Sequence, residues 1–255
     1  MNLLFLGDVV GSHGCRFVSS KISELKQQYK IDVTVVNGEN SADGNGITKS
    51  SADFLFRNGA DIITTGNHCF RRKEIMDMYD GCDTLLRPAN YPEGVTGKGV
   101  CIYDMGSVQI AVINLMGTIY MDSLDNPFDV IDKLLSNIDT KNIFVDFHAE
   151  ATSEKKAMGH YLAGRVTGVI GTHTHVQTAD STILKNHTAY ITDVGMCGAE
   201  MSVLGVKSEL AIEKIKTHCP VKFIESTEPA FINGVVIEFN QNSGEALSIL
   251  PVIIR

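Results

Sequence analysis

The sequence lacks three features that would each indicate a particular class of protein: closely paired cysteines, a long apolar run and a basic leader. Its six cysteines form no CxxC pair and no regular framework, which indicates reduced thiols in a cytoplasmic protein. No apolar run approaches the roughly 18 to 20 residues of a membrane span. Residues 1–8 contain no basic residue before a short apolar stretch, so they are predicted to form a buried strand and not a signal peptide.

Positive charge is also scarce in this chain. The 22 Lys and Arg residues face 30 Asp and Glu residues, which gives a formal net charge of −8. No Lys/Arg-rich stripe is present to replace the counterions of a nucleic-acid backbone, so nonspecific binding of duplex nucleic acid is not expected. An acidic protein can still bind phosphate groups when metal ions supply the positive charge.

What the sequence does contain is typical of a globular protein. It has 255 residues, 44% of them hydrophobic, and a mean hydropathy of +0.04. This composition excludes a disordered tail protein, a coiled coil and a collagen-like repeat. There is no internal repeat and no linker longer than about a dozen residues, so a single domain over residues 1–255 is predicted.

Short apolar runs alternate with helical patterns along the chain, which predicts an α/β fold. The apolar runs are continuous, so we expect interior strands that are covered on both faces. The predicted strands cover residues 3–6, 33–36, 62–65, 143–147 and 169–170, and helices are predicted at 16–28 and 51–58. Hairpins are predicted for 100–105 with 108–114, 183–185 with 188–192, and 235–239 with 246–254. These elements indicate a mixed sheet or two packed sheets with outer helices.

Potential metal ligands follow five of the apolar runs. They are Asp8, Glu39 with Asn40, Asn67 with His68, His148, and His173 with His175. In α/β sheets, ligands bind in the crevice at the carboxyl ends of the strands. Carboxylates, amides and imidazoles that converge there are the mixture of hard and borderline ligands that divalent metals take.

Each of these residues has an ordinary alternative role when taken alone. Asp8 could cap a helix, Glu39 and Asn40 could lie in a solvated loop, and His148 could be a satisfied core histidine. The pair His173 and His175 is more specific, because residues i and i+2 of an extended segment face the same way, with Cα atoms roughly 6.5 to 7 Å apart. That spacing suits two imidazoles on metals about 3.5 to 4 Å apart, and the whole set predicts a dinuclear site.

In this order, the motifs resemble those of the calcineurin-like metallophosphoesterase superfamily, and more closely its YmdB-like branch of cyclic-nucleotide phosphodiesterases. The branch is indicated by GENSADGNGIT at 38–48, RPANYP at 87–92, DFHAEATSEK at 146–155, residues 171–180 and TDVGMCG at 192–198. The similarity extends over essentially the whole chain. It implies a four-layer α/β/β/α sandwich with mixed sheets and with the metals above the inner sheets.

The resemblance also implies two metal ions per chain, bridged by Glu39. One ion would be held by Asp8, Glu39, Asn40 and His175, and the other by Glu39, Asn67, His148 and His173. The wider superfamily usually has a histidine two residues after the first aspartate and an aspartate at the bridging position. Here Val10 and Glu39 occupy those positions, and Asn40 would serve as a metal ligand in place of the missing histidine. This departure leaves the metal identity open, with iron and manganese as the leading candidates.

The function implied is hydrolysis of small cyclic nucleotides, 2′,3′-cyclic and also 3′,5′-cyclic. Two divalent ions carry a charge of +4 and the carboxylates of Asp8 and Glu39 together carry −2. The net charge of the site is therefore positive, so the site can bind a phosphodiester. A metal-bound hydroxide would attack phosphorus. His68 resembles the histidine that protonates the leaving oxygen, although it could instead only orient a metal ligand.

The residues that follow His68 differ from those of many relatives. Many relatives carry a tryptophan after Gly-Asn-His, whereas this chain has no tryptophan and continues with Phe70, Arg71 and Arg72. These residues could stack on a base and bind a phosphate, or they could form a solvated start of a helix.

Other possible functions are a broader phosphomonoesterase or nuclease, and a nucleotide-sensing regulator without turnover. The relatives further suggest a homo-oligomer.

Overall fold

Strand β1 (Asn2–Leu6) faces two different apolar cores. Leu4 and Leu6 belong to one buried cluster, whereas Leu3 and Phe5 belong to another. Successive side chains of a strand point to opposite faces, so β1 is covered on both sides. This is the arrangement that its continuous apolar run predicts, and it places β1 inside a layered structure.

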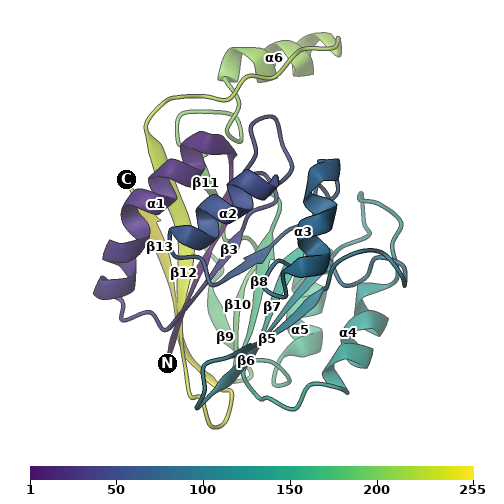
Figure 1. Cartoon of the computed structure of the whole chain (residues 1–255), viewed down its shortest axis with the longest axis vertical. Coiled ribbons are helices and arrows are strands. Elements are labelled where there is room, and N and C mark those ends of the chain that lie inside the picture. The colour runs from purple at the N-terminus through teal and green to yellow at the C-terminus, as the bar shows by residue number, and fades with distance from the viewer.

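The computed structural model describes residues 1–255 as two mixed sheets with helices outside them (Figure 1). The seven-stranded sheet contains β1, β2 (Asp8–Val9), β3 (Val33–Asn37), β4 (Ile62–Thr64), β11 (Met196–Ala199), β12 (Ala230–Phe239) and β13 (Ala246–Ile254). The six-stranded sheet contains β5 (Val100–Asp104), β6 (Gln109–Met116), β7 (Ile143–His148), β8 (Gly168–Thr172), β9 (Thr182–Leu184) and β10 (Thr188–Ile191). The helices are α1 (Gly11–Gln28), α2 (Lys49–Arg57), α3 (Met76–Gly81), α4 (Pro127–Leu135), α5 (Thr152–Leu162) and α6 (Ser208–Thr217), with the 3₁₀ turn η1 (Lys73–Ile75).

Three apolar clusters separate four layers. The first cluster joins α1 and α2 to the seven-stranded sheet, for example through Ile22 and Leu55. The second lies between the two sheets and contains Phe144 of β7 and Val235 of β12. The third joins the six-stranded sheet to α4 and α5. The predicted α/β/β/α sandwich is therefore confirmed. The core shared by the two sheets is consistent with one domain over residues 1–255, and this domain assignment stays a prediction.

The strand directions bring the ends of several strands to one edge. In the seven-stranded sheet, β1, β3 and β4 are parallel neighbours, in the order β1-β3-β4. In the six-stranded sheet, β6, β7 and β8 are parallel neighbours as well. All three predicted hairpins form antiparallel pairs, namely β5 with β6, β9 with β10, and β12 with β13.

Two helices begin earlier than predicted, at Gly11 and at Lys49. For α2, the reason is a capping box in which the Thr48 side chain accepts a hydrogen bond from the Ser51 backbone N–H and the Ser51 side chain accepts one from the Thr48 backbone N–H. For α1, the first turn, GSHG at residues 11–14, contains no apolar side chain and so gives no apolar periodicity. Helix α6 lies at one end of the molecule, away from the sheets (Figure 1). None of the helices is both long enough and apolar enough to cross a bilayer.

Candidate metal centre

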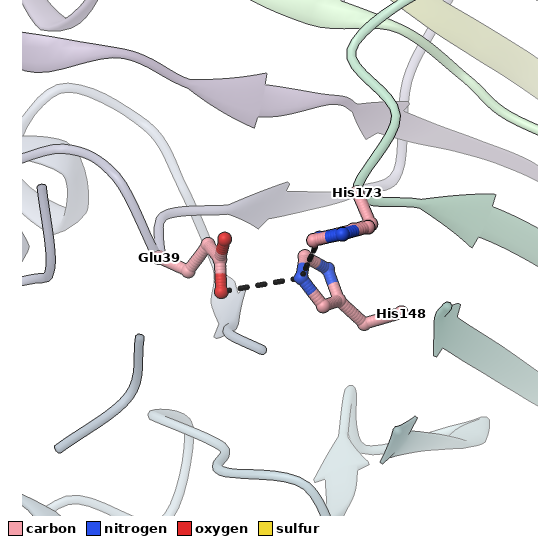
Figure 2. A group of neighbouring side chains, drawn as sticks. All are labelled: Glu39, His148 and His173. Carbon is pink, nitrogen blue, oxygen red and sulfur yellow. Dashed lines mark hydrogen bonds and ion pairs between the residues drawn. The ribbon is translucent and has the colours of Figure 1, made fainter. Parts of the chain in front are cut away.

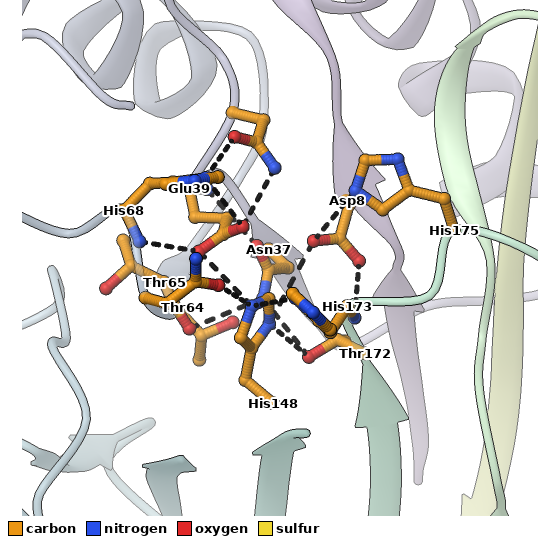
Figure 3. Close-up of polar contacts among 12 residues, drawn as sticks. Asp8, Asn37, Glu39, Thr64, Thr65, His68, His148, Thr172, His173 and His175 are labelled. Atoms are coloured by element: carbon orange, nitrogen blue, oxygen red, sulfur yellow. Dashed lines mark hydrogen bonds and ion pairs between the residues drawn. The ribbon is translucent and has the colours of Figure 1, made fainter. Parts of the chain in front are cut away.

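The predicted ligands gather where the two sheets meet. Asp8 is the first residue of β2, just after β1, and Glu39 and Asn40 follow β3. Asn67 and His68 follow β4. From the other sheet, His148 is the last residue of β7 and His173 follows β8 directly, as Figure 3 shows. The sequence places His148 in a loop, whereas the structure places it at the end of the strand itself.

His148 is the centre of the tightest group. Its Nε2 atom lies 2.9 Å from Asn67 Oδ1, 3.0 Å from His173 Nδ1 and 3.3 Å from Glu39 Oε2. Figure 2 shows the glutamate and the two histidines turned toward one another. One ligand atom from each of Glu39, His148 and His173 lies within 4.8 Å of the other two. The structure thus brings together all four residues predicted for the second ion.

The other ring nitrogen of His148 is tied to a buried chain of hydrogen bonds. Nδ1 lies 2.9 Å from Thr172 Oγ1, and that hydroxyl donates to Asp146 Oδ1 at 2.7 Å. Because the hydroxyl proton is directed to Asp146, Nδ1 is the donor to Thr172. A neutral His148 then presents a lone pair at Nε2, facing Asn67 Oδ1, His173 Nδ1 and Glu39 Oε2. A divalent cation satisfies several converging lone pairs at once, so these residues fit a metal.

The ligands predicted for the first ion are arranged more loosely. His175 Nε2 is 3.7 Å from Asp8 Oδ1. Asp8 Oδ1 and His175 Nδ1 are both buried without a hydrogen-bond partner. A buried polar atom without a partner is costly, and a bound cation would satisfy Asp8 Oδ1. Asn40 donates to Glu39 Oε1 at 2.8 Å, while its own oxygen lies 2.9 Å from His68 Nδ1.

Burial and neighbouring charges shift the pKa values of this group. Burial alone raises the pKa of Glu39, but His148 and His68 outweigh it and hold that pKa well below its usual value. Burial raises the pKa of Asp8. Burial alone lowers the pKa of His148, yet Glu39, Asp8 and Asp146 raise it to about 9. Burial and the adjacent His148 lower the pKa of His173 to about 3. The negative potential that favours a proton on His148 also favours a metal cation in its place.

The backbone of the loop that carries His173 and His175 is not extended, so the predicted conformation of this segment is wrong. His173 has φ = 99° and His175 has φ = 66°, so both residues adopt left-handed backbone conformations. Both imidazoles still face the site, with His173 beside His148 and His175 beside Asp8 (Figure 3). The prediction of two inward-facing histidines is met, but the i, i+2 periodicity of a strand is not the reason.

Gly66, just before Asn67, packs closely against two of the candidate ligands. A Cβ atom built on Gly66 would overlap the His148 ring and Glu39 Oε2. Any larger residue would therefore displace the side chain of Glu39 or of His148. The absence of a side chain at Gly66 is therefore part of the candidate metal centre.

Sequence reasoning missed the polar residues beneath the ligands. Asp146 accepts hydrogen bonds from Asn37 Nδ2 at 3.0 Å and from Thr64 Oγ1 at 2.5 Å, besides that from Thr172. Burial raises the pKa of Asp146 to about 6. A signal was present, because Asp146 lies two residues before His148 on the same face of a strand, and Thr172 directly precedes His173.

The residues after His68 have structural contacts. Phe70 packs edge-on against Tyr79 and Tyr91, with ring centroids 5.5 and 5.2 Å away. Arg72 donates hydrogen bonds to the backbone carbonyls of residues 43–45. Arg71 is exposed and has no ion pair. The aromatic ring of Phe70 is therefore used in packing, and Arg72 stabilises a neighbouring loop.

Comparison with known proteins gives matches over the full length of the chain. A family model described as "YmdB-like protein" matches residues 4–252. A 2′,3′-cyclic-nucleotide 2′-phosphodiesterase of Bacillus subtilis (strain 168) is 46% identical over 257 residues, which cover 100% of this chain and 97% of that protein. The crystal structure of a phosphatase from Mycoplasma pneumoniae superposes with a TM-score of 0.94 at 34% identity, covering 100% of this chain and 93% of that one. The calcineurin-like phosphoesterase YfkN from Bacillus subtilis has a TM-score of 0.54 at 11% identity, covers 100% of this chain and 90% of its own, and confirms the predicted fold class.

Proposed function

The chain belongs to the YmdB-like family and is a phosphodiesterase, and from that premise we propose that it hydrolyses small cyclic nucleotides with two metal ions. We propose 2′,3′-cyclic nucleotides as the substrates, with 3′,5′-cyclic nucleotides as a secondary class. The observation that carries this proposal is the convergence of Asn67, His173 and Glu39 on Nε2 of His148. Atoms that converge in this way form poor hydrogen bonds with one another, whereas a bound cation can interact with all of them.

The metal ions would be held by the residues that the sequence predicts. Asp8, Glu39, Asn40 and His175 are proposed for one ion, and Glu39, Asn67, His148 and His173 for the other, with iron or manganese as the metal. When bound, such ions lower the pKa of water and stabilise the charge that develops on a phosphoryl group. The charged form of Glu39, favoured by His148 and His68, is the form that can bridge two cations.

His68 is proposed to protonate the leaving oxygen. Its Nδ1 atom faces only acceptors, Asn40 Oδ1 at 2.9 Å and Glu39 Oε1 at 3.3 Å, so Nδ1 is a donor. Its backbone N–H donates to Glu39 Oε2 at 3.2 Å, which fixes the residue beside the carboxylate. Nε2 has no protein partner, and a proton held there can pass to the ribose 2′ oxygen when its bond to phosphorus breaks.

The decisive experiment is hydrolysis of 2′,3′-cyclic AMP with added Mn²⁺ by the native protein and by Glu39→Gln. Removing the charge that both ions share should lower kcat by more than about 100-fold. Glu24→Gln is the control, because Glu24 is an exposed residue of α1 that forms an ion pair with Lys21. Metal analysis of the native protein should give close to two ions per chain.

The outcomes separate the alternative functions. Turnover that is unchanged in Glu39→Gln would contradict the bridging role of this residue. An active native protein with one ion or none would contradict the dinuclear site. Hydrolysis of phosphomonoesters or RNA in place of cyclic nucleotides would favour a broader phosphatase or nuclease. Tight nucleotide binding without turnover, with both ions present, would favour a sensor. The cytoplasmic location stays a prediction.

We also propose that copies of this chain associate through an arm, which we define as residues 201–224. Only Ala211 of α6 is buried, and the arm exposes Ile212, Ile215, Phe223 and Ile224 by 49% to 68%. A helix of ten residues is marginal in water without a packing partner. The arm carries four lysines and two glutamates, a charge of +2, whereas the rest of the chain carries −10. The rest of a second copy therefore carries a net charge opposite to that of the arm, which favours their association.

A further inference from the structure

A buried ion pair lies next to the candidate metal centre but outside its ligand set. Lys155 Nζ and Asp193 Oδ2 are 2.6 Å apart, and their side chains are 1% and 0% exposed. Removing charged groups from water costs free energy that a single ion pair often does not recover. We therefore expect an ammonium group and a carboxylate that are buried this deeply to have a role other than stabilising the fold.

Both charged groups bind the backbone of the loop that carries His173 and His175. Lys155 Nζ donates to the carbonyl of Thr172 at 2.6 Å. Asp193 Oδ2 accepts from the backbone N–H of Thr174 at 3.0 Å, between the two histidines. The pair therefore holds the main chain on both sides of His173.

Asp193 is itself held in place by its other oxygen. Oδ1 accepts a hydrogen bond from the backbone N–H of Gly195 at 2.9 Å. Lys155 lies near the start of α5, which follows directly after β7 and His148. The ion pair thus links three segments: the start of α5, the 172–175 loop and the segment after β10.

The loop needs such support because of its backbone conformation. His173 and His175 both have positive φ angles, 99° and 66°. Residues with a Cβ atom adopt this region at a cost and stay in it only where surrounding contacts require it. Two further hydrogen bonds anchor the loop at this point. The backbone N–H of His173 donates to Asp8 Oδ2 at 3.1 Å, and the backbone N–H of Ala149 donates to the carbonyl of Thr172 at 3.4 Å.

We propose that Lys155 and Asp193 are positioning residues, whose buried ion pair fixes residues 172–175 so that His173 and His175 face the metal centre. This proposal rests on the proposed function, since it requires the two histidines to be metal ligands. It gives a role to polar residues of segments 146–155 and 192–198 that the ligand set leaves unused.

The test is Mn²⁺ binding to metal-free protein, measured by isothermal titration, for the native chain, Lys155→Met and Lys156→Met. Lys156 is the matched control, because it is the next residue of α5 and pairs with Asp180 at 3.1 Å in a half-exposed site. We expect Lys155→Met to bind Mn²⁺ about 10- to 100-fold more weakly, as for other residues that orient metal ligands. Lys156→Met should bind Mn²⁺ like the native protein.

Lys155→Met leaves Asp193 buried without its partner and could unfold the chain, so further variants are needed. Asp193→Asn keeps the shape of the side chain, and its single acceptor oxygen cannot serve both Gly195 and Thr174. The double variant with Lys155→Met and Asp193→Asn leaves no unpaired buried charge. Its Tm should therefore recover relative to Lys155→Met, whereas its Mn²⁺ affinity should stay low, because the loop has still lost the hydrogen bonds that Lys155 and Asp193 make to it.

The results distinguish positioning from a general contribution to stability. If Mn²⁺ affinity recovers together with Tm in the double variant, the pair is only structural and the proposal is overturned. Native affinity in folded Asp193→Asn would overturn it as well. If the native protein itself binds no Mn²⁺, then the proposed function fails first, and this proposal fails with it. With native binding intact, equal affinity in all variants would refute the positioning role alone.

Discussion

At the scale of single residues, the two histidines closest to Glu39 differ in their surroundings. The side chain of His148 is 0% exposed and both of its ring nitrogens have partners, whereas that of His68 is 24% exposed and only Nδ1 has one. A proton on His148 is enclosed by ligand atoms. A proton on Nε2 of His68 can exchange with solvent and reach a substrate, so the structure favours His68 over His148 as the acid.

The role of His68 can be tested by changing the leaving group. We expect His68→Ala to lower kcat for 2′,3′-cyclic AMP by about 10²- to 10⁴-fold, since the ribose oxygen needs a proton to depart. For bis(p-nitrophenyl) phosphate the loss should be much smaller, because nitrophenolate leaves without one. Steady-state kinetics with both substrates at equal metal content gives the comparison, with exposed His160→Ala as the control. Equal losses for both substrates would show that His68 only orients its neighbours.

At the scale of elements, the site depends on how closely strand ends and their loops approach one another. The loop after β4 brings Gly66 against the side chains of β7 and of the loop after β3. This approach is possible only without a Cβ atom, since protein interiors leave few voids that could absorb one.

We therefore expect Gly66→Ala to reduce the Mn²⁺ content of the purified protein by at least half and its kcat by more than about 10-fold, because the new methyl group displaces His148 or Glu39. Gly81→Ala is the matched control, because a Cβ on Gly81 has no atom within 4 Å. Metal analysis, activity and circular dichroism of both variants check this. Native metal content and activity in Gly66→Ala would show that the close packing of Gly66 against His148 and Glu39 is not needed for metal binding.

At the scale of the whole molecule, the candidate metal centre belongs to neither sheet alone. Asp8, Glu39 and Asn67 come from the seven-stranded sheet, and His148 and His173 come from the six-stranded one. The apolar cluster between the sheets holds the two halves of the site in register. We therefore expect the ligands to assemble only when both sheets are folded and packed.

The exposed arm of residues 201–224 leads to a prediction about assembly. Light scattering coupled to size-exclusion chromatography should give more than one chain per particle for the native protein. Ile215→Glu should shift the particle toward a single chain, because it places a charge on the exposed apolar face of α6. Leu247→Glu should not, because Leu247 lies on β13, outside the arm, although it is also more than half exposed. A monomeric native protein, or dissociation by the β13 variant instead, would contradict association through the arm.

The sequence by itself determined the elements, because their signals are local. Apolar runs, helical periodicity and turn residues come from neighbouring positions, so the interior strands and all three hairpins were predictable. The ligand candidates were also visible, since each comes at or just after the end of a short apolar run. Such signals do not extend to partners far apart in the chain, and the antiparallel pairing of β1 with β12 was not predicted.

Only the tertiary structure decided how the candidate ligands meet. The left-handed backbone of His173 and His175, the close packing of Gly66 against His148 and Glu39, and the buried pair of Lys155 with Asp193 all depend on contacts between distant segments. Packing fixes such features after the local elements form, and it can impose backbone conformations that the residues themselves disfavour. Residue types and their order therefore specify which chemistry is available, and the packing of two sheets brings those residues together into one site.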